Sequence, residues 1–287
     1  MQGHAHRPET VNVTYRRMHF DFEHTGFPKY WHDDSPFISL FWDALSTAFP
    51  PGEKFFIDSA RAARDRIQDE ALREELASFC QQEGHHTFQH RKLNRMVGEQ
   101  GFELKRLEAR FARPLDRVRA KTGVETMLAV TMALEHFTAG FAQEYLGNPA
   151  ISQGADPNVR ALWAWHAVEE AEHKATCFDI YERLGGGYFR RVTVLPAAWF
   201  LLISITLRNT FDLLRQDRQL GNVSELVRGL RYLLGRRGLI TRMLPRFFAY
   251  FRPGFHPWRY DDSSLANAWL ADNARYIEAK GLSAAAE

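Results

Sequence analysis

Hydrophobic positions recur at helical spacing along most of the chain, and capping or breaking residues divide them into segments. The apolar run 37–49 follows Ser35-Pro36, a pair typical of a helix start, and ends at Pro50-Pro51-Gly52. The pattern then predicts long helices over 69–99, 123–146 and 156–184, and a short one over 102–121. The chain shows no alternating strand series and no internal repeat. We therefore expect an all-α fold.

Three parts differ in their patterns. Residues 1–34 are mixed and rich in aromatic side chains, which indicates an extended N-terminal strap. Residues 35–187 hold the long helices and predict a bundle. Residues 188–287 are first apolar and basic and then polar, and we expect a helical extension that packs on the bundle.

Carboxylate and histidine residues lie on the predicted core faces of two long helices. Glu83 and His86 are three residues apart, so they lie about 60° apart around a helix and can face one object. Glu170 and His173 repeat this spacing, and His166 lies four residues before Glu170. Two Glu-x-x-His pairs on separate long helices are typical of a two-metal site in an all-α protein.

Two more carboxylates come from other helices. Glu135 has apolar or small neighbours at helical spacing, so its charge needs a partner in the core. Glu53 follows the Pro-Pro-Gly break, where a glutamate is equally explained by the helix dipole, and both interpretations stay open. Four carboxylates balance two divalent cations, and oxygen ligands mixed with imidazole suit iron, or else manganese, better than structural zinc.

Other polar residues are candidates for the surroundings of this site. His90 lies on the face of the first pair, as the partner of a ligand, a spare ligand or a core residue. Glu169 is an alternative ligand to its neighbour, whereas Glu172 projects to the opposite side and is expected in solvent. Thr131 and Thr138 are small enough to leave a pocket beside the metals, which suits an organic substrate better than a transported ion.

The order Glu, Glu-x-x-His, Glu, Glu-x-x-His resembles the ferritin-like di-iron carboxylate superfamily, with its four-helix bundle. Four segments are more closely similar to a bacterial family labelled predicted metal-dependent hydrolase: 49–56, 83–86, 134–136 and 165–173. The additional histidine at 166 is similar to the extra ligand of the di-iron arylamine N-oxygenases. The metal ligands that these resemblances imply are Glu53, Glu83, His86, Glu135, His166, Glu170 and His173.

The ligand set resembles that of oxygen-activating sites, which implies a non-haem di-iron oxidoreductase, or one with an Fe/Mn pair. Such an enzyme activates O2 with electrons from an external donor and oxidises an organic, lipophilic substrate. Glu135 and Glu170 are the candidate catalytic carboxylates, and we expect Glu135 and one other carboxylate to bridge the metals or to shift. The alternative is a two-metal hydrolase of esters, amides or phosphoesters. Iron storage with ferroxidase chemistry is less favoured.

The net charge of +2 hides an asymmetry. Residues 188–260 contain 13 Arg, no Lys and three acidic residues, a net +10 that leaves −8 for the rest of the chain. The uncharged stretch 192–207 would span only ~24 Å as a helix and is interrupted by Pro196, which argues against a transmembrane crossing. A buried core helix, a layer on an anionic membrane surface or a cover over an oily substrate fits better.

Composition bounds the class of protein. The 287 residues are 45% hydrophobic and 25% charged, which excludes disordered, fibrous and small disulfide-stapled chains. Two cysteines and the lack of a signal segment predict a cytoplasmic protein without disulfides, with membrane association as a variant. Arginine without lysine, and without a nucleic-acid-binding motif, predicts no nucleic-acid partner. A homodimer is compatible with the sequence.

Overall fold

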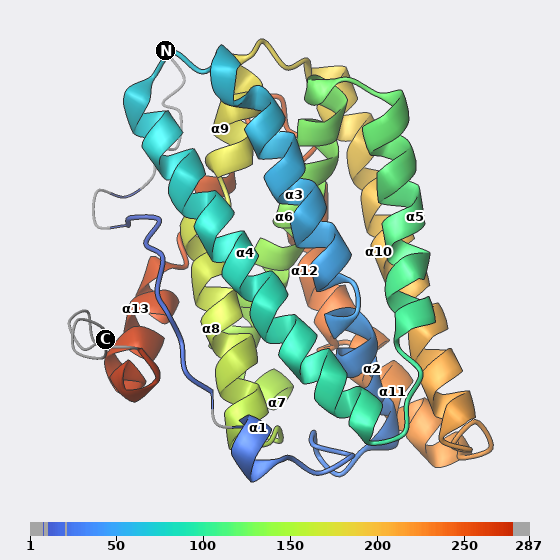
Figure 1. The fold of residues 1–287 in the computed structure, drawn as a ribbon. Coiled ribbons are helices and arrows are strands. Elements are labelled where there is room, and N and C mark those ends of the chain that lie inside the picture. Colours follow the sequence, from blue (N-terminus) through green and yellow to red (C-terminus); the bar gives the residue numbers. More distant parts are fainter. Residues whose placement is uncertain (1–7, 9–10, 21, 278–287) are drawn as a thin grey trace, which may run out of the picture.

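The computed structural model describes residues 8, 11–20 and 22–277, and in these ranges the protein is helical, with two isolated β-bridges and no sheet. The long helices stand side by side in a bundle (Figure 1). This confirms the predicted all-α fold. The α-helices are α1 Phe22–Thr25, α2 Pro36–Ser46, α3 Phe49–Ala63, α4 Glu70–Glu99, α5 Lys105–Lys121, α6 Val124–Gly147, α7 Pro149–Ser152, α8 Pro157–His173, α9 Thr176–Arg183, α10 Tyr188–Gln216, α11 Val223–Leu234, α12 Leu239–Ala249 and α13 Ser263–Asp272.

Side-chain caps begin several of these helices where the sequence predicts. The Ser35 side chain accepts a hydrogen bond from the Ile38 N–H at the start of α2. Asp69 and Asp156 cap α4 and α8 in the same way. Each cap satisfies N–H groups that have no partner within the helix, and this local effect explains why the starts were predictable.

The single helix predicted over 156–184 is wrong, because the chain breaks between α8 and α9. Lys174 lies at the break and is buried. Its Nζ donates hydrogen bonds to Asp262 and, at 2.6 Å, to the Tyr260 carbonyl oxygen. The hydrogen-bond partners of Lys174 at this break therefore lie almost ninety residues away in the chain. Hydrophobic periodicity cannot predict such contacts.

The interruption expected at Pro196 is also wrong, because α10 continues through it from Tyr188 to Gln216. A proline in a helix removes one backbone hydrogen bond and crowds the preceding turn. Pro196 is exposed, so its ring faces solvent and does not crowd a neighbouring helix.

The packing places four helices around the polar interior. Helix α3 packs against α4 and α6, and α6 packs against α8. Helices of the extension cover this bundle: α10 lies on α2 and α6, α12 on α6, α11 on α2 and α12, and α13 on α8. One hydrophobic cluster runs through nearly the whole chain. The division into strap, bundle and extension stays a prediction.

Close packing of α11 on α2 depends on Gly229. A Cβ atom added there would lie 1.9 Å from Cδ1 of the buried Phe37. We expect Gly229→Ala to lower the free energy of unfolding by about 1–3 kcal/mol, because the ring or the helix must shift. Urea denaturation measures this. The matched control is Gly221→Ala, where an added Cβ meets no atom within 4 Å. Equal losses in both variants would contradict the packing argument.

Candidate metal centre

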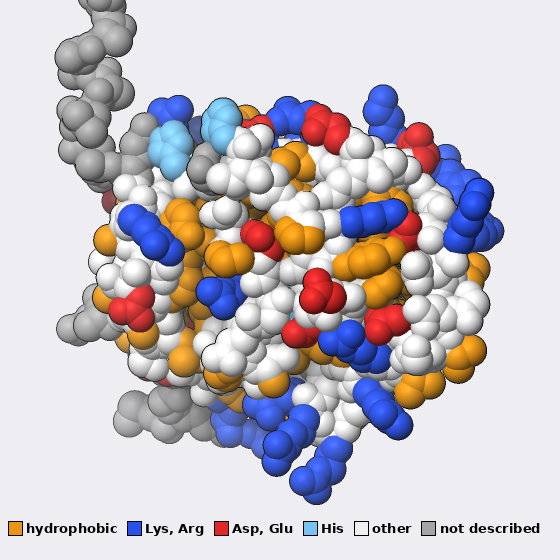
Figure 2. Space-filling model, turned by 90° about the horizontal axis from the view of Figure 1, so that it is seen from below, with side chains coloured by type: hydrophobic (Ala, Val, Ile, Leu, Met, Phe, Trp, Pro, Cys, Tyr) orange, Lys and Arg blue, Asp and Glu red, His pale blue; other side chains and the backbone are white. Residues whose placement is uncertain are grey.

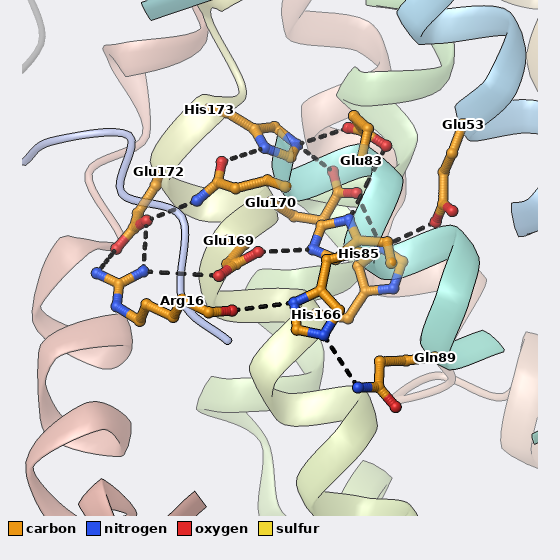
Figure 3. Close-up of polar contacts among 12 residues, drawn as sticks. Arg16, Glu53, Glu83, His85, Gln89, His166, Glu169, Glu170, Glu172 and His173 are labelled. Carbon is orange, nitrogen blue, oxygen red and sulfur yellow. Dashed lines mark hydrogen bonds and ion pairs between the residues drawn. The ribbon is translucent and has the colours of Figure 1, made fainter. Parts of the chain in front are cut away.

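Side chains from α3, α4, α6 and α8 converge in the bundle interior, and Figure 3 shows many of them pointing toward one region. They form two groups. Within each group, the potential ligand atoms all lie within 4.8 Å of one another. All of these residues are buried. The first group is Glu53, His86 and His166, and the second is Glu83, Glu135, Glu170 and His173. The structure thus brings together all the residues that the sequence nominates as ligands.

Glu83 and Glu170 belong to the second group and also contact histidines of the first. Glu83 Oε1 is 3.2 Å from His173 Nε2, and its Oε2 is 3.9 Å from His86 Nδ1. Glu170 Oε1 is 2.9 Å from His166 Nε2, and its Oε2 is 3.5 Å from His173 Nε2. Each carboxylate therefore offers one oxygen to each group, as a carboxylate that links two cations would.

Glu135 belongs to the second group and Glu53 to the first. Glu135 Oε2 is 3.3 Å from His173 Nε2, which belongs to its own group, whereas Glu83 and Glu170 each also lie near a histidine of the other group. Of the three carboxylates in the second group, Glu83 and Glu170 thus lie nearest to the first group, and a bridging role for Glu135 stays a prediction. Glu53 is fully buried and lies in the second turn of α3, so the helix dipole alone does not account for it. Its Oε1 is 3.9 Å from His166 Nε2.

Buried atoms without a hydrogen-bond partner gather in this interior. Such atoms are uncommon in folded proteins, because the loss of water must be compensated. Here they include Glu53 Oε1, both carboxylate oxygens of Glu83, Glu135 and Glu169, both ring nitrogens of His86, and His173 Nε2. Unpartnered oxygen and imidazole atoms around one region fit divalent cations, which would satisfy them together.

The pKa shifts of the buried carboxylates also fit bound cations. Burial raises the pKa of Glu83 well above its usual value, and burial together with Glu170 raises the pKa of Glu135 to about 7. Burial also acts to raise the pKa of Glu170, but His173 and His166 outweigh it and hold that pKa at about 2. Without a cation, these carboxylates cannot all be ionised in the core. A bound cation would favour their ionised forms.

A chain of hydrogen bonds fixes the tautomer of His166. Ser46 Oγ donates to Asn94 Oδ1 (2.6 Å), so it accepts from His90 Nδ1 (2.9 Å). His90 Nε2 is then an acceptor for the His166 Nδ1–H, 2.7 Å away. The lone pair of His166 Nε2 is left facing the carboxylates. Of the three roles open to His90, the geometry favours the partner of a ligand.

Gln82 fixes His173 in a similar way. Its Nε2 donates to the Thr14 carbonyl oxygen and to Glu172, each at 3.1 Å, so its Oε1 faces His173 Nδ1 at 2.9 Å. His173 Nδ1 therefore carries a proton, and Nε2 points to the carboxylates. The role of Gln82 is not visible in the sequence, because its partners lie on α8 and on the extended strap. Only its position directly before Glu83 hints at a role.

The strap also explains two glutamates of α8. Glu172, expected in solvent, is buried, and its Oε1 lies 2.6 Å from Arg16 Nη2. That expectation is wrong because the strap crosses this face of α8. Glu169 is fully buried, with Oε2 3.1 Å from His86 Nε2 but not aligned for a hydrogen bond, and Oε1 3.8 Å from Arg16 Nη1. It lies outside both ligand groups, in contact with one of their members.

We expect Glu169→Gln to weaken metal binding by about 10- to 100-fold, because a carboxylate beside a ligand imidazole orients the ring and raises its basicity. Competition with a chromophoric chelator measures the affinity. The control is Glu99→Gln, at the exposed end of α4. An unchanged affinity in Glu169→Gln would show that His86 does not depend on this neighbour.

A narrow apolar cleft reaches the centre. Glu53 and Thr138 line it together with side chains of α2, α3, α5, α6 and α10, among them Phe49, Phe137 and Leu202. Thr138 also donates a hydrogen bond to Glu170. Thr131 instead bonds Ser59 at 2.7 Å and does not line the cleft. Of the two threonines expected beside a pocket, the structure places one there.

Comparison with known proteins gives one finding. A family model described as "Predicted metal-dependent hydrolase" matches residues 14–261, which is most of the chain. No curated protein and no solved structure matches this chain.

Proposed function

Because the chain belongs to this family of predicted metal-dependent hydrolases, we propose that it hydrolyses an ester, amide or phosphoester with two divalent cations. The observation that carries the proposal is the pair of adjoining buried ligand groups, with Glu83 and Glu170 near histidines of both. The mixture of carboxylate and imidazole ligands favours iron or manganese.

The expected O2-activating oxidoreductase, with its external electron donor, is wrong. The family description overturns it, since this description names hydrolysis and covers the helices that supply every candidate ligand. The ligand order alone led to the error, because carboxylate and histidine ligands on four helices suit more than one two-metal chemistry. The resemblance to ferritin-like proteins stays a prediction, as no solved structure matches.

The chain's own residues have distinct roles in this proposal. When bound, two divalent cations lower the pKa of a bound water and polarise the scissile carbonyl or phosphoryl group. Glu53, His86 and His166 would hold one cation and Glu135 and His173 the other, while Glu83 and Glu170 have an oxygen near histidines of both groups and could serve either. His90 and Gln82 keep the His166 and His173 rings oriented.

The cleft supports a substrate with an apolar group. Its exposed lining is apolar, and Phe49 and Phe137 are among its walls. The cleft has a volume of only about 20 Å³, so an acyl or alkyl chain would enter it by moving the lining side chains apart. The chain would then exclude water while the bond to be cleaved lies near Glu53 and Thr138. We therefore favour lipophilic esters or amides among the substrates that a two-metal hydrolase can take.

The test is metal analysis followed by turnover of p-nitrophenyl esters of increasing chain length, in the absence of O2. We expect hydrolysis that is lost with a chelator, is restored by Mn²⁺ or Fe²⁺ and is faster for longer acyl chains. Amide and phosphoester substrates are tested in parallel. No turnover of any of the three classes by fully loaded protein would refute the proposal. Turnover that favours short chains would refute the assignment of the cleft.

A further inference from the structure

One line of aromatic side chains runs along the outward side of α10. Phe189, Phe200 and Phe211 are eleven residues apart, close to three helical turns, so they lie on one face. All three are exposed, Phe189 by 79% and Phe200 by 75%. No charged residue occurs between Arg191 and Arg208. A helix face that water covers is ordinarily polar, so this one marks a contact surface.

Helix α11 adds a second apolar stripe. Val223, Val227, Leu230 and Leu234 are spaced by four, three and four residues, so they share one side of the helix, and all are exposed. The side that α11 buries is a different one, represented by Gly229 and Leu233. The apolar sector of α11 is therefore wider than the face it packs against the protein.

The two helices share a neighbour, because α10 and α11 both pack on α2. Gly229 of α11 packs on Phe37 of α2, and the Phe37 ring makes an edge contact with Phe211 of α10 at 6.2 Å between centroids. We call the exposed apolar side chains of the two helices, taken together, the outer apolar surface. It comprises Phe200 and Phe211 of α10 and Val223, Val227, Leu230 and Leu234 of α11.

Arginine accompanies this surface. Figure 2 shows the molecule from below, with Lys and Arg side chains gathered along the lower edge of the view beside hydrophobic ones. Four exposed arginines on or next to α10 and α11 form no ion pair with any residue that the structure describes: Arg208, Arg231, Arg236 and Arg237. Unpaired arginines beside exposed aliphatic and aromatic side chains suit a partner that is both apolar and anionic.

We propose that the outer apolar surface docks on an anionic lipid membrane, with α10 and α11 lying in the interface. A second copy of the chain is a poorer partner, because a two-fold contact would bring two arginine-rich surfaces together. This proposal does not depend on the hydrolytic one.

Helix α10 is long and apolar enough to cross a membrane, judged by length and composition alone, but 39% of its most apolar window is buried in the protein. Its inward side also carries Asn209, whose Nδ2 donates to Thr47 Oγ1 at 3.2 Å. Lipid can therefore meet only one side of α10, and the geometry favours an interfacial position over a span.

The test is flotation of the full-length, metal-loaded protein with vesicles of phosphatidylcholine and phosphatidylglycerol in a 7:3 ratio. We expect binding at low salt that falls at least tenfold in high salt and on vesicles of phosphatidylcholine alone. The double variants Leu230→Ser/Leu234→Ser and Arg236→Glu/Arg237→Glu should each lose at least tenfold in binding. The matched control is Phe88→Ser on α4, where Phe88 is also exposed. Circular dichroism and the thermal midpoint verify that each variant folds.

Three outcomes overturn the proposal. One is the absence of flotation at low salt. Another is an equal loss in Phe88→Ser, which would show that binding is not specific to α10 and α11. The third is a concentration-dependent dimer in analytical ultracentrifugation that Leu230→Ser/Leu234→Ser abolishes, which would make the surface an interface between copies. Hydrolysis of a water-soluble ester is measured separately, so failure of the proposed activity and failure of docking are distinguishable.

Discussion

Replacing Glu83 with glutamine is expected to remove at least one of two bound metal ions and to lower hydrolytic turnover by more than about 100-fold. That is more than the loss typical of a residue that only orients a ligand. Glu83 offers one oxygen to each ligand group, so both cations would lose a charged ligand at once. An amide cannot supply the negative charge that helps to balance two divalent cations.

In the metal-free protein, the same substitution should not lower stability. Because burial holds the pKa of Glu83 well above its usual value, a neutral isostere suits the empty core at least as well. We therefore expect metal-free Glu83→Gln to unfold at the same temperature as the metal-free parent or at a higher one. The matched control is Glu74→Gln, an exposed position on the same helix. Full metal content and normal turnover in Glu83→Gln would remove this residue from the site.

Metal affinity should rise steeply between pH 6 and pH 8. In the metal-free protein, burial and Glu170 raise the pKa of Glu135 to about 7, and Glu135 and Glu170 raise the pKa of His173 despite its burial. These groups hold protons that a cation must displace. Burial lowers the pKa of His86 and His166, which are therefore already neutral and release none. For each proton that the cation displaces, the metal affinity rises about tenfold per unit increase in pH.

The stability of the metal-free protein follows from the same shifts. The raised pKa of Glu135 contributes stability that is fully present below its ordinary value near 4.5 and is lost as pH rises through about 7. A bound cation reverses this, so the metal-induced rise in melting temperature should grow from pH 6 to pH 8. The lowered pKa of Glu170 contributes stability that is present above its ordinary value near 4.5 and is lost as pH falls through about 2.

Chelator competition at three pH values, with calorimetry in two buffers, measures the number of protons released. The control is Asp43→Asn. Asp43 is a fully buried carboxylate whose burial raises its pKa to about 8, but it lies outside both ligand groups. The pH dependence of metal affinity should be unchanged in this variant. An affinity that is constant from pH 6 to pH 8 would mean that the ligands are already ionised in the empty protein.

The extension illustrates what a sequence pattern leaves open. The excess of arginine over 188–260 and the uncharged stretch within it are visible in the sequence, but they are equally compatible with a buried helix. The structure shows that α10 buries one side and exposes Phe189 and Phe200 on the other. Burial on one side depends on the neighbours α2 and α6, which no local spacing specifies.

The sequence by itself determined the helical class, the starts of α2, α4 and α8, and the presence of two Glu-x-x-His pairs whose side chains share a helix face. These follow from short-range geometry, since a cap acts within one turn and a Glu-x-x-His spacing places both side chains on one face in any helix. Only the tertiary structure decided that Glu83 and Glu170 of the second ligand group also contact histidines of the first, that Lys174 pairs with Asp262 at the break after α8, and that the strap covers Glu172. Each of these rests on contacts between residues far apart in the chain, and such contacts are set by how the helices pack rather than by their periodicity.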